Sequence, residues 1–189
     1  MKKQFLRTEK TKTLVLAAMF LAVGLVLPSL TGSIKEIGDS LLPMHLVVML
    51  CGAICGWQYG AFVGLVLPFL RSLLVSMPPL YPNAVWMALE LATYGFVIGF
   101  LYALRKKYSL GYLLLCLVSS MLAGRVVWGI TKAILLGVAG KSFGIGAFLV
   151  GGFADAVPGL IIQFITVPLV ITLLERKKAK GAAYDLSGI

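Results

Sequence analysis

Residues 83–104 have the sequence NAVWMALELATYGFVIGFLYAL and are followed directly by Arg105-Lys106-Lys107. Glu90 is the only charged residue in this apolar run, which is long enough for a membrane-spanning helix of roughly 20 residues. Lys and Arg beside such a run are retained on the cytoplasmic side during insertion. The stretch therefore predicts a transmembrane helix that runs inward and carries a carboxylate in its outer half.

The rest of the chain has the composition of a membrane protein, because 60% of its 189 residues are hydrophobic and only 13% are charged. Five more apolar segments are expected to form membrane helices: 13–31, 43–57, 59–77, 109–138 and 146–174. We predict an all-α, polytopic membrane protein with a bundle of six transmembrane helices in one domain. The second segment is short and the last two are long, so tilt, kinks or partial re-entry are expected.

Positive charge predicts the topology of this bundle. Most of the 17 Lys and Arg residues fall in residues 1–12, 105–107 and 175–189. Both termini and the loop after the fourth helix are therefore expected in the cytoplasm, which six spans permit. Residues 1–12 and 175–189 would be cytoplasmic ends of a 13–174 bundle. Basic runs that flank apolar spans are not typical of nucleic-acid binding, so no nucleic-acid partner is expected.

Ionisable residues interrupt the apolar segments at five positions: Arg71, Glu90, Arg125, Lys132 and Asp155. With a rise of ~1.5 Å per residue and the predicted topology, all five lie in the outer half of the membrane. Charges inside a membrane are costly, and they usually pair and usually mark function. The sequence predicts a binding cavity open to the outside. The alternative is that the two acids simply pair with the cations.

Helical spacing groups these charges with other polar and aromatic side chains, since residues three, four and seven apart share a helix face. The three predicted faces are Asn83, Met87, Glu90 and Tyr94; Arg125, Trp128 and Lys132; and Asp155, Gly159 and Gln163. Such mixtures are expected of a small-molecule site. The candidate substrate-binding residues are Asn83, Glu90, Tyr94, Arg125, Trp128, Lys132, Asp155, Gln163 and His45.

Two outer loops are candidates for covering the site. Residues 76–83 contain three prolines, which limit the freedom of the loop, and an aromatic ring at Tyr81. Residues 31–42 carry Lys35, Glu36 and Asp39 and lead to His45, the only histidine. Turn formation and solvated polarity explain these loops equally well. No metal site or cofactor is expected, because the cysteines lack zinc-type spacing and His45 has no ligand-type neighbour in sequence.

Small residues recur at intervals of four. Gly52, Gly56, Gly60 and Gly64 form one series, and Gly95 and Gly99 form another. This spacing lets helix backbones approach closely in lipid. Ala18 and Ala22 form an Ala-x-x-x-Ala stripe on the first helix, which suits either internal packing or docking on another membrane protein.

Several motifs occur in a defined order along the chain. They are Ala18-Met19-Phe20-Leu21-Ala22, Leu42-Pro43-Met44-His45-Leu46, the segment 51–57, the segment 77–84, and Glu90-Leu91-Ala92-Thr93-Tyr94-Gly95. Together with six spans, this set resembles the substrate-binding S components of energy-coupling factor (ECF) transporters. The likeness is to the branch with predicted pantothenate- and pyridoxine-type carriers, and it covers nearly the whole chain.

The resemblance implies a multi-pass protein of a bacterial or archaeal plasma membrane that binds a vitamin tightly from outside. Such a subunit docks through its first helices, here through Ala18 and Ala22, on a membrane coupling (T) protein that holds two cytoplasmic ATPases, and then topples inward. The chain itself lacks the Gly-x-x-x-x-Gly-Lys-Ser/Thr phosphate loop. ATP hydrolysis is therefore expected only in the partners, and the chain is not expected to be an enzyme.

The class of substrate stays open at this level. Three membrane cations against two acids favour a carboxylate such as pantothenate, or a phosphorylated vitamin. Glu90 or Asp155 could instead bind the hydroxyls or ring nitrogen of a pyridoxine- or pyrimidine-type ligand, which Trp86, Trp128 and Tyr94 could stack against.

Two other functions also remain open. One is a stand-alone, ion-coupled secondary transporter in which Asp155 or Glu90 carries the proton. The other is an intramembrane enzyme that uses Glu90 or Asp155 with His45 as acid and base.

Overall fold

The computed structural model of the protein describes residues 2–31, 42–104 and 108–187. These residues form helices and no strand, so the predicted all-α class is confirmed. The α-helices are α1 (Lys2–Thr31), α3 (Pro43–Cys55), α4 (Trp57–Val75), α5 (Val85–Ala103), α6 (Leu110–Val138), α7 (Ile145–Leu149) and α8 (Val157–Ser187). Two π-helical turns, η1 (Leu80–Ala84) and η2 (Val150–Ala154), lead into α5 and follow α7.

Five helical segments of the described chain are long and apolar enough to cross a membrane: Lys10–Leu30, Trp57–Val75, Leu80–Ala103, Leu110–Val138 and Val157–Lys177. The predicted helix at 43–57 is the exception, because α3 has 13 residues and ends at Cys55. It is followed by Gly56, whose φ of 99° lies in the left-handed region that glycine favours. The predicted number of six spans is therefore not confirmed.

The segment predicted at 146–174 is not one continuous helix, and its break is of the kind expected for a long segment with a kink or partial re-entry. The chain forms α7 and η2 over 145–154, turns at Asp155 and Ala156, and begins α8 at Val157. Pro158 lies in the first turn of α8, where a residue without a backbone N–H costs no helical hydrogen bond.

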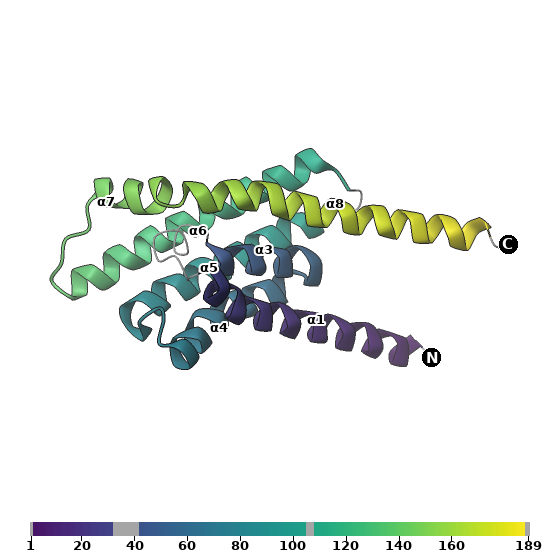
Figure 1. The fold of residues 1–189 in the computed structure, drawn as a ribbon, viewed down its shortest axis with the longest axis horizontal. Coiled ribbons are helices and arrows are strands. Elements are labelled where there is room, and N and C mark those ends of the chain that lie inside the picture. The colour runs from purple at the N-terminus through teal and green to yellow at the C-terminus, as the bar shows by residue number, and fades with distance from the viewer. Residues whose placement is uncertain (1, 32–41, 105–107, 188–189) are drawn as a thin grey trace.

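Both chain termini lie at the same end of the bundle, and the connection between α6 and α7 lies at the other end (Figure 1). This arrangement agrees with the predicted topology, while the cytoplasmic location of that end stays a prediction. Lys35, Glu36 and Asp39 of the predicted outer loop, and Arg105, Lys106 and Lys107, lie outside the described residues.

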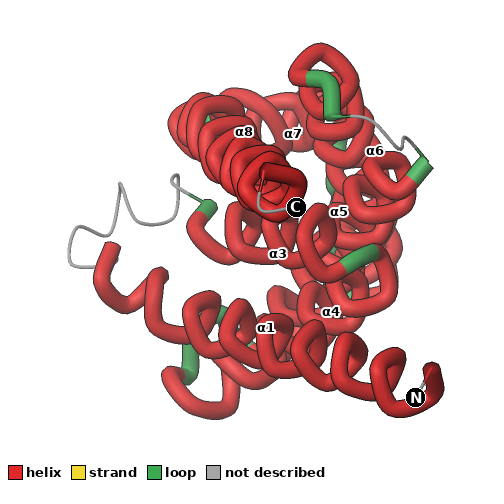
Figure 2. The backbone as a smooth tube through the Cα atoms, turned by 90° about the vertical axis from the view of Figure 1, so that its right-hand side faces the viewer, coloured by secondary structure: helices red, strands yellow, loops and turns green. Residues whose placement is uncertain are grey.

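Helices α3 and α5 occupy the middle of the bundle, with α1 and α4 on one side and α6 and α8 on the other (Figure 2). One apolar cluster joins α3, α5, α6 and α8, and a second joins α1, α3, α4 and α5. The short helix α3 thus contributes to both clusters. Its buried position, with eight buried residues in 13, explains why a helix shorter than the membrane is retained.

The glycine series determine how closely these helices pack. A Cβ atom on Gly60 would lie 2.5 Å from the Cα of Gly52, and one on Gly99 would lie 2.6 Å from the carbonyl oxygen of Gly52. A Cβ on Gly95 would overlap the backbone of Gly60. The predicted close packing is confirmed for these residues, while Gly56 instead separates α3 from α4.

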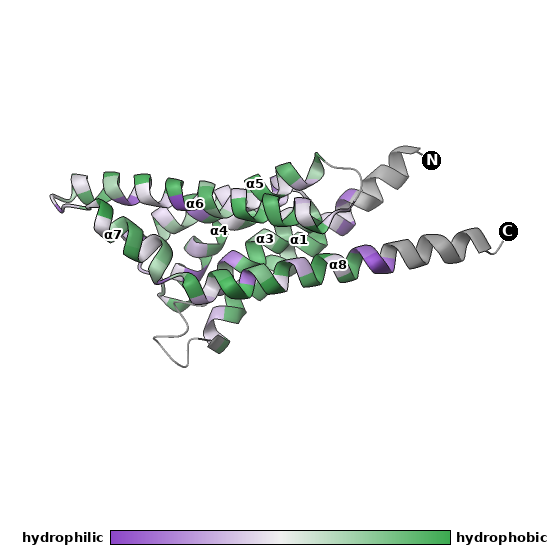
Figure 3. Ribbon diagram, turned by 90° about the horizontal axis from the view of Figure 1, so that it is seen from above, coloured by the Kyte–Doolittle hydropathy of each residue, from purple (hydrophilic) through white to green (hydrophobic). Residues whose placement is uncertain are grey.

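Hydrophobic residues dominate the helices over most of their length (Figure 3). Many large apolar side chains are exposed on the outer faces, among them Leu14, Phe62, Leu73 and Ile134. An outer surface of this kind suits lipid as the surrounding medium.

Candidate functional site

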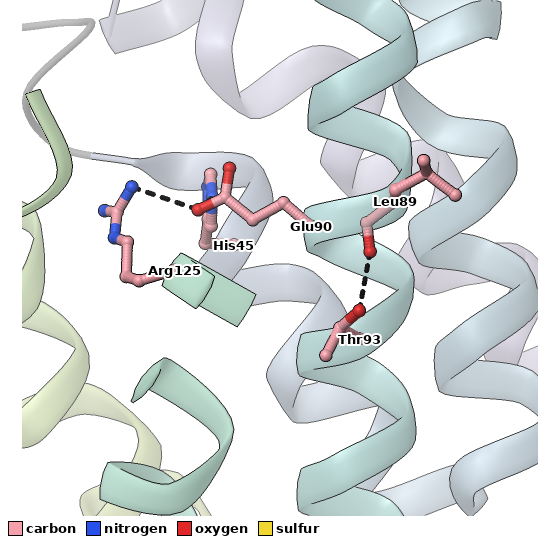
Figure 4. A network of polar contacts seen from close by, with 5 residues as sticks. All are labelled: His45, Leu89, Glu90, Thr93 and Arg125. Atoms are coloured by element: carbon pink, nitrogen blue, oxygen red, sulfur yellow. Dashed lines mark hydrogen bonds and ion pairs between the residues drawn. The ribbon is translucent and has the colours of Figure 1, made fainter. Parts of the chain in front are cut away.

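A buried ion pair between α5 and α6 forms the centre of the candidate site. The Nη1 atom of Arg125 donates a hydrogen bond to Oε1 of Glu90 at 3.0 Å, as Figure 4 shows. Glu90 is 2% and Arg125 is 4% exposed. This contact places the two residues at the same level along the bundle, while their depth in the membrane stays a prediction. The ion pair itself does not decide between the binding cavity and simple pairing, because both hypotheses allow it.

His45 reaches the same carboxylate from α3. Its Nε2 lies 3.4 Å from Oε1 of Glu90 (Figure 4). The helix begins at Pro43, which is pre-organised for a first helical turn, and this start places His45 in that turn. Glu90 therefore faces two basic side chains, from α3 and α6.

Tyr94 lies one turn after Glu90 on α5 and is fully buried. Its ring meets the ring of His45 edge to face, with centroids 5.1 Å apart and planes at 84°. On its other side it packs against α6 at Gly124, where a Cβ atom would lie 2.5 Å from the Tyr94 ring. Gly124 thus makes room for Tyr94 beside Arg125. Sequence reasoning missed this role, although a glycine directly before a membrane arginine was a visible signal.

Gln163 is fully buried on α8. It shares a helix face with Leu160 and Val167, three residues before it and four after it. Both of these pack in the apolar cluster that contains Tyr94. Gln163 is therefore buried in the interior of the bundle, next to residues of the apolar cluster that also contains Tyr94.

These five residues, His45, Glu90, Tyr94, Arg125 and Gln163, are called the polar cluster below. Most of their polar atoms find no hydrogen-bond partner among the described residues. The atoms are Nδ1 and Nε2 of His45, the Tyr94 hydroxyl, Nε and Nη2 of Arg125, and Nε2 and Oε1 of Gln163. His45 Nε2 lies 3.4 Å from Glu90 Oε1, a contact that lacks the geometry of a hydrogen bond. A buried donor or acceptor left without a partner costs about 1–3 kcal/mol. The cluster thus combines donors and acceptors, inside an apolar bundle, that are available to a polar ligand.

Lys132 and Trp128 form a second group on the same face of α6 as Arg125. The Nζ atom of Lys132 lies 4.5 Å from the ring centroid of Trp128, 5.2 Å from that of Phe143 and 5.3 Å from that of Trp86. We call these four residues the lysine–aromatic group. A cation at this distance from aromatic faces is attracted by them. Phe143 is a member that sequence reasoning missed, because it comes from the connection after α6 and shares no helical spacing with the others.

The remaining candidates are placed differently. Asp155 is exposed in the turn before α8, so its expected burial is wrong, and it does not belong to the helix that carries Gln163. Arg71 is buried, and its Nη1 donates to the carbonyl oxygen of Leu25 at 2.9 Å and to the Ser29 hydroxyl at 3.3 Å, which fastens α4 to α1. Asn83 lies half-buried in η1.

An apolar hollow of about 400 Å³ lies between α6 and α7 and shares Phe143 with the lysine–aromatic group. It is lined by Val126, Gly129, Ile130, Ala133, Phe143, Gly144, Ile145 and Phe148. Val126, Ile130 and Ala133 are exposed, whereas Arg125 and Trp128 are buried. The hollow therefore opens on the outer surface of α6 and lacks charged groups. In the described part of the chain, no three His, Cys, Asp or Glu side chains gather to hold a metal ion.

Ala18 and Ala22 lie on the exposed face of α1. The helix turns Ala17 and Gly24 to the bundle instead, and a Cβ atom on Gly24 would lie 2.7 Å from Leu67. The two alanines therefore form part of a smooth outer surface and do not pack inside the described bundle.

Comparison with known proteins gives one match. The family described as ECF transporter, substrate-specific component, matches the chain over residues 12–172. No curated protein and no solved structure matches it.

Proposed function

This chain belongs to the family of ECF transporter substrate-specific components, and we propose that its polar cluster captures a small water-soluble vitamin for ATP-driven uptake. Members of this family bind small-molecule substrates and work with a T protein and ATPases. They are substrate-binding transporter subunits and not enzymes. The vitamin proposed is of the pantothenate type or of the vitamin B6 or pyrimidine type.

One observation supports the polar cluster as the site. His45, Tyr94, Arg125 and Gln163 keep buried polar atoms without partners among the described residues. A buried ion pair seldom adds stability over apolar packing, and each unpartnered atom reduces stability further. A need for stability alone would therefore not favour this cluster, whereas a ligand that supplies the missing hydrogen bonds would account for it.

The position of the cluster suits capture from one side. His45, Glu90 and Gln163 lie in the first half of α3, α5 and α8, and these halves point to the end of the bundle opposite the chain termini (Figure 1). With cytoplasmic termini, as the basic residues predict, the site would face the outside of the cell membrane. Trp128 and Lys132 would lie between the cluster and the outer end of α6.

The exposed face of α1 is proposed to dock on the T protein. Of the five candidate spans, the one in α1 has the smallest buried share, and the Ala18 and Ala22 stripe lies on its outer face. Small side chains let a partner helix approach closely in lipid.

Transport by reconstituted vesicles tests this proposal. We expect a vitamin from a defined panel to raise the melting temperature of the purified protein, and we expect its uptake only when T protein, ATPases and ATP are also present. Accumulation by the purified chain alone, driven by a proton or sodium gradient, would contradict the proposal and favour a stand-alone secondary transporter. Absence of binding by every vitamin would contradict it as well.

A further inference from the structure

We propose that the substrate carries a carboxylate, which the Nε–Nη2 edge of Arg125 holds through two parallel hydrogen bonds. This inference rests on the proposed function and specifies its substrate class.

The geometry of the guanidinium group is the first argument. Arg125 uses Nη1 for Glu90, at 3.0 Å. Its Nε and Nη2 atoms are buried and have no hydrogen-bond partner in the described part of the chain. The N–H groups of these two atoms point the same way along one edge of the planar group, and their spacing matches the two oxygens of a carboxylate. The ion pair with Glu90 thus orients Arg125 and leaves its Nε–Nη2 edge buried and without a hydrogen-bond partner among the described residues.

The contacts that the Glu90 carboxylate already makes are the second argument. Its Oε1 already faces Arg125 Nη1 and His45 Nε2, at 3.0 and 3.4 Å. A cationic or basic substrate would have to compete with both groups for this carboxylate. An anionic substrate would leave these contacts in place. The contacts of Glu90 therefore favour a substrate that carries a carboxylate.

The charges around the site balance among the described residues. Glu90 pairs with Arg125, and Lys132, two turns further on along the same face of α6, interacts electrostatically with both Glu90 and Asp155. Asp155 itself is exposed in the turn before α8. The expected preference for an acid therefore rests on the Arg125 edge and on the contacts of Glu90, and not on a surplus of positive charge.

The neutral members of the polar cluster indicate what else the substrate carries. The Tyr94 hydroxyl and both polar atoms of Gln163 are buried and unpartnered among the described residues. A hydroxyl can donate and accept, and a side-chain amide offers both a donor and an acceptor. A carboxylic acid that also carries hydroxyl or amide groups would satisfy these atoms together with the Arg125 edge.

Matched pairs of ligands test the inference. Calorimetric titration would compare pantothenate with pantothenol, nicotinate with nicotinamide, and biotin with its amide, and pyridoxine and thiamine would serve as vitamins without a carboxylate. For the acid that binds, we expect an affinity at least about tenfold higher than for its neutral partner, as for the loss of a charged hydrogen bond.

Two variants locate that preference. Arg125→Lys should bring the ratio of acid to neutral affinity close to one, because an ammonium cannot reproduce the guanidinium edge. Arg71→Lys makes the same change at a buried arginine that bonds to α1, and it should leave the ratio unchanged. The ratio is a suitable readout because a loss of stability alone would lower both affinities together.

The outcomes separate this inference from the proposed function. Tight binding of pyridoxine or thiamine without binding of any acid would overturn the carboxylate and leave vitamin capture intact. The carboxylate would also be overturned if the neutral partner bound as tightly as the acid. It would be overturned too if Arg125→Lys left the ratio of acid to neutral affinity unchanged, which is expected if another part of the chain hydrogen-bonds to the Arg125 edge. Absence of binding by every compound would contradict vitamin capture itself.

Discussion

At the scale of single residues, two buried arginines of this bundle make different kinds of contact. Arg71 and Arg125 are both buried, but Arg71 bonds to a carbonyl oxygen and a hydroxyl of α1, whereas Arg125 shares Glu90 with His45 and keeps two nitrogens without partners among the described residues. Burial and charge alone do not distinguish these cases. The hydrogen-bond partners do, and they favour Arg125 as the residue available to a ligand.

The Glu90–Arg125 pair can be tested by a double-mutant cycle. Arg125→Ala should weaken vitamin binding about ten- to a hundredfold, because a charged hydrogen bond in a desolvated site contributes about 1.5–3 kcal/mol. Glu90→Ala should also weaken binding, because it removes the ion pair that orients Arg125. The double variant should bind no better than either single variant. Calorimetric titration measures all three. Thr93→Ala serves as control, since the Thr93 hydroxyl bonds to Leu89 within α5, at 2.7 Å (Figure 4), and should leave affinity unchanged.

The opposite result has a clear meaning. If the double variant folds and regains wild-type affinity, then the two charges only neutralise each other, and the assignment of the site to this pair is wrong.

At the scale of helices, backbone contact between α3, α4 and α5 holds the central helices in place. These contacts exist because Gly52, Gly60 and Gly95 meet without side chains between them. The crossing in turn determines where α5 presents Glu90 and Tyr94 to α3 and α6. A change at the crossing is therefore expected to alter both stability and the site.

Gly95→Ala tests this dependence. The added Cβ would overlap the backbone of Gly60, and backbone cannot move aside as a flexible side chain can. We expect the free energy of unfolding to fall by about 1–3 kcal/mol, as measured by denaturation in detergent, and vitamin affinity to fall with it. Gly111→Ala is the matched control, because nothing lies within 4 Å of its added Cβ and alanine is the better helix former. Equal stability of both variants would show that the crossing tolerates a methyl group.

At the scale of the whole molecule, binding and docking are assigned to different regions. The polar cluster lies between α3, α5, α6 and α8, whereas the exposed stripe of α1 lies on the far side of α3 and α4 (Figure 2). A transporter subunit that must hold a substrate and also engage a partner can use such a separation, since each surface is free to change without the other.

Ala18→Trp and Ala22→Trp test the separation. Each should block uptake in vesicles that contain T protein, ATPases and ATP, because a bulky side chain keeps the partner helix at a distance. Vitamin affinity should stay nearly unchanged. Val118→Trp places the same side chain on an exposed position of α6 and should leave uptake intact. Loss of binding in a folded Ala18 or Ala22 variant would place α1 in the site, and normal uptake in both would remove the docking assignment.

The sequence by itself determined the helical membrane class and the level of several membrane charges. Hydrophobic length and helical period are local properties, so they were sufficient to predict that Glu90 and Arg125 lie at the same depth and that Arg125, Trp128 and Lys132 share a face. His45, Tyr94 and Gln163 were also among the candidates, and the structure buries all three.

Only the tertiary structure decided which of these residues meet. It exposed Asp155 in a turn, bonded Arg71 to α1, brought Phe143 to Lys132, and placed Gly124 against Tyr94. Each of these outcomes depends on how closely and at what angle two helices cross, or on where a connection folds back. The spacing of residues along one helix carries no information about the distance of that helix from another helix. These contacts could therefore be found only in the tertiary structure.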